Sequence, residues 1–100
     1  MRIWRADASV EGAESYRKHL ESVVLPELRR IQGFRKAELL TRNVDGGVDI
    51  EVHTQWESVD SVRAFAGYDT ERAVVEPGAK AVLRTYDSVV SLFDIIEYEG

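Results

Sequence analysis

The sequence contains no cysteine and only two histidines among its 100 residues. Without cysteine, a disulfide framework, a thiolate nucleophile and a sulfur-ligated metal or iron–sulfur cluster are excluded. The histidines, His19 and His53, show no spacing typical of a metal site. We therefore expect any chemistry to proceed without a metal or another cofactor.

Basic residues are outnumbered, with 13 against 18 acidic ones and a formal net charge of −5. The basic pairs Arg29-Arg30 and Arg35-Lys36 have acidic residues close by. They indicate solvated ends of secondary-structure elements rather than a track for phosphates. Nucleic acid is therefore not an expected partner.

Long apolar runs are also missing, because the uncharged run from Val89 to Phe93 is interrupted by Ser91. This excludes a membrane-spanning segment, and Met1 to Arg5 lack the apolar stretch of a signal peptide. We expect a cytoplasmic protein. A length of 100 residues with 44% hydrophobic and 31% charged residues indicates a single globular domain, 1–100, with a modest core.

The first third of the chain predicts a strand and then an amphipathic helix. Polar and apolar residues alternate from Arg2 to Ala6, and Ser9 is a suitable N-cap. Apolar residues then recur every three or four positions, at Ala13, Tyr16, Leu20, Val23, Val24, Leu28 and Ile31. Pro26 should kink or restart this helix near Leu25, and Gly33 should end the helical segment.

Two strands are predicted next, over 34–43 and 48–56, joined by Asp45-Gly46-Gly47 in a tight hairpin. The second strand alternates between an apolar face that ends at Trp56 and a polar face that includes Glu51, His53 and Gln55.

The last part predicts a short helix and a long strand. Ser58 is a suitable N-cap for a helix that ends at Gly67, and 69–75 allows a further turn or two. Residues 79–83 have helical character after Pro77-Gly78. Ser88 to Tyr98 is rich in β-branched and aromatic residues and predicts a long final strand.

This order predicts an α+β, ferredoxin-like split βαβ fold with a four-stranded antiparallel sheet. Helices cover one face of such a sheet, and the final segment carries apolar residues on both faces. We therefore expect a homodimer in which two sheets pack face to face.

Two groups of short motifs resemble the antibiotic biosynthesis monooxygenase (ABM) domain family along nearly the whole chain. The first comprises Arg2-Ile3-Trp4, Val24-Leu25-Pro26 and Gly33-Phe34-Arg35. The second comprises Trp56-Glu57-Ser58 and the run from Val62 to Gly67. The resemblance implies a dimeric α+β barrel with a pocket in each subunit between sheet and helices.

The family resemblance implies one of two activities. Some members oxygenate polycyclic aromatic or quinol substrates with O2 and without metal or flavin, and others bind and degrade haem. The haem-degrading branch has a tryptophan and an axial histidine where this chain has Phe65 and Val75. Without an imidazole at Val75, haem ligation of that type is not expected.

Cofactor-free oxygenation requires a base, hydrogen-bond donors and a dry aromatic cavity. His19, at the edge of the helix stripe, is the candidate base, and Trp56 and Tyr68 are the candidate donors. Each has a structural alternative: an inert surface histidine, a core tryptophan and a rim tyrosine.

Two further positions bear on catalysis. His53 lies on the polar side of its strand and is expected in a dimer-interface cluster. Relatives have a His-Tyr pair where the last strand here has Leu92-Phe93, followed by Asp94, which is either a base or a solvated aspartate.

The sequence predicts a homodimer that binds a hydrophobic, aromatic small molecule and oxygenates it. The alternative is a dimeric binding module without chemistry.

Overall fold

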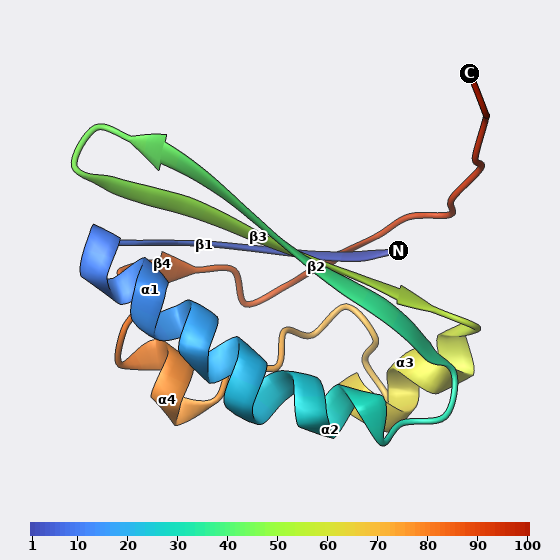
Figure 1. Cartoon of the computed structure of the whole chain (residues 1–100). Helices are drawn as coiled ribbons and strands as arrows, with labels where there is room; N and C mark the ends of the chain where they lie inside the picture. Colours follow the sequence, from blue (N-terminus) through green and yellow to red (C-terminus); the bar gives the residue numbers. More distant parts are fainter.

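The computed structural model describes all residues, 1–100, as one antiparallel sheet with helices on one of its faces (Figure 1). The strand order is β2-β3-β1-β4, and β5 pairs with β1 as well. This α+β architecture is compatible with the predicted ferredoxin-like arrangement.

The three long strands are β1 (Arg2–Ala8), β2 (Phe34–Val44) and β3 (Gly47–Trp56). The predicted hairpin is confirmed, with Val44 opposite Gly47 and a positive φ of 78° at Gly46. A left-handed backbone of this kind favours glycine, which explains the residue at the turn. In the β1–β3 register Arg2 lies opposite Thr54, so the two residues share one face of the sheet.

One long helical segment crosses that face as α1 (Val10–His19), the π-helical stretch η1 (Leu20–Val24) and α2 (Leu25–Arg29). The Ser9 side chain accepts a hydrogen bond from the Gly12 N–H at 3.0 Å, which confirms the predicted N-cap. Pro26 has no N–H to donate, and α-helical geometry restarts at Leu25 after the π turn, as predicted.

Two shorter helices complete the helical layer, α3 (Val59–Ala66) and α4 (Pro77–Lys80). Ser58 caps α3, and Gly67 ends it with a positive φ of 86°; both were predicted. Over 69–75 the structure has a single hydrogen-bonded turn, in which the Arg72 N–H donates to the carbonyl of Asp69 at 3.1 Å, and no helix. Residues 67–76, named here the connecting segment, run irregularly from α3 to α4.

The predicted long strand over Ser88–Tyr98 is wrong. The chain forms two-residue strands instead, β4 (Thr85–Tyr86) and β5 (Ser91–Leu92), and residues 93–100 belong to no helix or strand. Between the two strands Val90 is only 4% exposed and packs in the core. Ala6 pairs with Tyr86 and Ile3 pairs with Ser91, so the four residues 87–90 stand opposite only two residues of β1, and this change of register interrupts the strand.

The core lies between the sheet and the helical layer. Leu28 and Ile50 are its largest fully buried side chains, and Trp4, Tyr16 and Leu20 are also buried. The opposite, open face of the sheet carries charged residues with ion pairs, Arg5 with Glu51 and Arg42 with Asp49. None of the helices combines the length and the hydropathy needed to cross a bilayer.

Candidate functional site

A cavity of about 50 Å³ lies between the sheet, the long helix and the connecting segment. Aromatic and aliphatic side chains form most of its wall, and a few polar groups face it; the named lining residues are Arg2, Trp4, Tyr16, His19, Val52, Thr54, Phe65 and Glu76. An apolar cavity with a few convergent polar groups is typical of a small-molecule site. We therefore take it as the candidate site.

His19 lines this cavity and its side chain is only 13% exposed. Its Nε2 atom is buried and has no hydrogen-bond partner. The nearest carboxylate oxygen, Oε2 of Glu76, lies 4.0 Å away, which is too far for a hydrogen bond. An unpaired buried imidazole nitrogen is costly, and it is available to a bound molecule.

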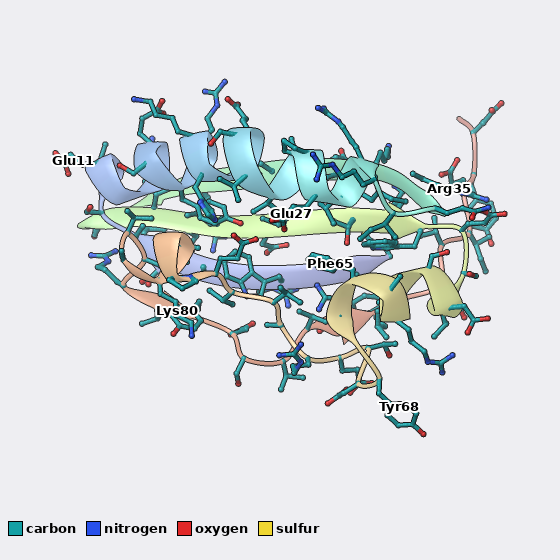
Figure 2. The ribbon with its side chains drawn as sticks, turned by 90° about the horizontal axis from the view of Figure 1, so that it is seen from below. Glu11, Glu27, Arg35, Phe65, Tyr68 and Lys80 are labelled. Atoms are coloured by element: carbon teal, nitrogen blue, oxygen red, sulfur yellow. The ribbon has the colours of Figure 1, made fainter.

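The carboxyl group of Glu76 lies beside His19 and interacts with that of Glu27. Burial raises the pKa of Glu76, and a hydrogen bond and the charge of Glu27 raise that pKa further, whereas His19 lowers it. Figure 2 shows Glu27 on the side of α2 that faces the rest of the helical layer. Glu76 therefore keeps its proton to a higher pH than an ordinary glutamate.

Trp4 and Tyr16 form the aromatic wall, with ring centroids 5.6 Å apart. The Trp4 indole N–H donates to the carbonyl of Asp87 at 2.9 Å, so it is not free for a ligand. Burial, and then the charge of Glu76, raise the pKa of the Tyr16 hydroxyl, which therefore stays protonated at neutral pH.

Arg2 and Thr54 occupy another part of the wall. Arg2 is only 5% exposed, and its guanidinium group lies 5.4 Å from the centre of the Phe65 ring. Burial, and then the charge of Arg72, lower the pKa of Arg2 to about 10. The guanidinium Nε donates to the carbonyl of Thr70 at 3.4 Å, and Nη2 donates to the carbonyl of Arg72.

Trp56 does not line the cavity directly. Its ring packs against Phe34 and Phe65, at centroid distances of 5.3 and 5.8 Å. Its indole N–H donates to Oγ1 of Thr54 at 2.9 Å. Trp56 therefore contacts two wall residues, Phe65 and Thr54, from behind, on the helix-covered side predicted for it.

Tyr68 lies away from the cavity. Its side chain is 96% exposed and points away from the protein (Figure 2), so the expected position at the pocket mouth is wrong. His53 lies on the open face and its Nε2 is 2.8 Å from Oε1 of Glu51, in the polar cluster predicted there. Asp94 follows β5 and is exposed, outside the cavity.

The sequence predicted His19 as a site residue, but it did not predict Arg2, Thr54 or Glu76. Arg2 shares the period-two alternation of Trp4, so the same strand pattern that buries the tryptophan also buries the arginine. Glu76 lies in the irregular connecting segment, where no local pattern indicates which side chain turns inward.

No family model matches the chain, and the search of curated proteins finds no match.

Proposed function

We propose that this protein binds a small aromatic molecule in the cavity and oxygenates it with O2. The observation that carries the proposal is the buried, unpaired Nε2 of His19 in a cavity walled by Trp4, Tyr16 and Phe65. An imidazole nitrogen without a protein partner is suited to accept a proton from an acidic phenol or carbon acid.

For an anthrone-type substrate, Nε2 of His19 takes a proton from the central CH2 carbon. The carbanion gives one electron to O2, and the two radicals combine to form a carbon–oxygen bond. Protonation of the peroxide by His19 and loss of water, with cleavage of the O–O bond and the remaining C–H bond, leave a ketone. One oxygen atom enters the product and the other leaves as water, and the substrate supplies all four electrons.

The size of the cavity sets a condition on this function. About 50 Å³ accommodates a few water molecules, whereas ligand sites usually occupy about 300–1,000 Å³. Entry of an aromatic ring therefore requires the connecting segment to shift. That segment contributes Val74, Val75 and Glu76 to the wall and contains no regular helix or strand.

We also propose the ferredoxin-like fold of the ABM family and a homodimer formed through the open face. The strand order supports the fold, since β1 lies between β3 and the final strands. A hollow of about 440 Å³ on the open face is lined by charges of both signs, including Arg5, Arg42, Asp49 and Glu51. Such a face is complementary to a second copy of itself under two-fold symmetry.

Binding without chemistry is a second candidate function. Leu92 and Phe93 favour it, because they are apolar where ABM relatives have a titratable pair. Leu92 and Phe93 are 38% and 54% exposed and do not line the cavity.

Oxygen uptake with an anthrone, measured alongside binding by calorimetry, tests the two functions. His19→Ala should reduce uptake about 10²- to 10⁴-fold, which is the usual contribution of a general base. His53→Ala is the matched control, because His53 lies on the open face. Binding without uptake would establish the second function, and equal uptake by both variants would exclude His19 as the base. The absence of both binding and uptake would refute both functions.

A further inference from the structure

Arg2 is a buried cation without an anionic partner in the protein. Its guanidinium group forms no ion pair, and no carboxylate stabilises its charge. The charged side chain that affects its pKa is another cation, Arg72. Its hydrogen bonds go to two neutral backbone carbonyls, those of Thr70 and Arg72, and Nη1 has no protein acceptor.

This arrangement is unusual in energetic terms. Buried charges in proteins are normally paired, because removal of an ion from water is costly unless an opposite charge compensates. Arg2 lines the cavity, so a molecule bound there can supply the missing negative charge.

Thr54 provides a second donor at the same place. It lies opposite Arg2 in the β1–β3 register, is 6% exposed and lines the cavity. Its Oγ1 accepts the indole N–H of Trp56, which leaves the Thr54 O–H to donate to another acceptor. Trp56 is thereby a positioning residue for this hydroxyl group.

We propose that Arg2 and Thr54 form a subsite for an anionic oxygen, carboxylate or phenolate, of the aromatic ligand. This inference rests on the proposed function in that it assigns the chemical class of the same ligand. Among the side chains that line the cavity Arg2 is the only arginine or lysine, whereas Nε2 of His19 lies 4.0 Å from a carboxyl oxygen of Glu76. The ligand therefore binds with its anionic oxygen at Arg2, and its ring lies between Trp4 and Phe65.

Binding of small probes tests the subsite. Calorimetric titrations would compare benzoate with neutral benzamide, and 4-nitrophenolate with 4-nitroanisole. We expect each anion to bind at least tenfold more tightly than its neutral counterpart, since a hydrogen bond to a charged group contributes about 1.5–3 kcal/mol. If benzoate binds more tightly than 4-nitrophenolate, the subsite prefers a carboxylate. The reverse order means that it prefers a phenolate.

Substitutions show which residues produce the preference for anionic probes. Arg2→Gln should remove it, Arg2→Lys should retain part of it, and Arg29→Gln, at an exposed arginine of α2 outside the cavity, should leave it unchanged. Thr54→Val provides an independent variant if Arg2→Gln does not fold, and it should weaken anion binding more than binding of the neutral probes.

Two outcomes would overturn the subsite, and they are distinguishable. If the neutral probes bind as tightly as the anions and compete with them for the same site, the subsite is refuted. The aromatic-binding function would then remain intact. Failure of every probe to bind would refute both.

Discussion

The indole N–H of Trp4 donates to the backbone carbonyl of Asp87 at 2.9 Å, and this bond joins residues 83 positions apart. Asp87 lies in the break between β4 and β5, where the chain leaves the edge of β1. The Asp87 carbonyl lies between the two short strands and accepts this hydrogen bond. The bond therefore holds the final segment over the core.

Trp4→Phe should lower the free energy of unfolding by more than about 0.5–1.5 kcal/mol, the net contribution of one hydrogen bond, because it also leaves a cavity where the larger indole ring was buried. Tyr86→Phe is the control, because Tyr86 is 37% exposed and its hydroxyl forms no hydrogen bond in the structure. Urea unfolding measures both, and an equal effect of the two substitutions would contradict the assignment.

Glu76→Gln should change how stability depends on pH. The pKa of Glu76 is raised in the folded state, so between its unfolded and folded pKa values the folded protein binds more protons. The free energy of unfolding of the wild type therefore falls as pH rises through this window. The variant lacks this decrease and should be the more stable protein at neutral pH.

Thermal unfolding from mildly acidic to neutral pH measures the difference. His19, Glu27 and Tyr16 face Glu76 and interact with its charge, so the difference between the two profiles reports the interaction of Glu76 with this cluster. Glu57→Gln, an exposed substitution outside this cluster, should leave the pH dependence of the wild type unchanged. A parallel pH profile for Glu76→Gln and the wild type would refute the assignment.

Ile50→Ala should lower the free energy of unfolding by about 2–5 kcal/mol, because it leaves a cavity at a fully buried position. Val10→Ala, at the exposed start of α1, provides the comparison: Val10 is 65% exposed and its truncation should lower the free energy of unfolding much less. Chemical unfolding curves measure both, and similar losses would contradict the assignment of Ile50 to the core.

The proposed homodimer should be sensitive to charge reversal on the open face. Arg42 is exposed and pairs with Asp49. Arg42→Glu should raise the dimer dissociation constant at least tenfold, since like charges in an interface cost several kcal/mol. Arg29→Glu, on the helical layer, should leave it unchanged. Sedimentation equilibrium measures both, and a monomeric wild type would refute the proposal.

Local patterns were sufficient for most of the fold. The Gly46 turn, the two serine caps and the restart at Leu25 depend on residues within a few positions of each other, so the sequence predicted them. The final strand was predicted wrongly because its path depends on distant contacts, the Trp4–Asp87 bond and burial of Val90.

The site was predictable only in part, for the same reason. The helical stripe indicated His19, but the cavity also uses a charged residue on a strand. Composition alone favours an exposed position for an arginine, and only the alternation with Trp4 indicates that Arg2 turns inward. Tyr68 was misplaced because the direction of the chain after Gly67 is not encoded in a periodic pattern.

The two edges of the sheet differ in what they offer to an additional strand. The β4–β5 edge is interrupted, so it presents no continuous row of N–H and C=O groups, whereas β2 presents an edge of 11 residues. Intermolecular strand addition, the usual first step of aggregation in β proteins, should therefore occur at β2. Charged side chains there, including Arg35, Lys36 and Glu38, oppose it. Their neutralisation, rather than changes in the final segment, should govern the solubility of this protein under destabilising conditions.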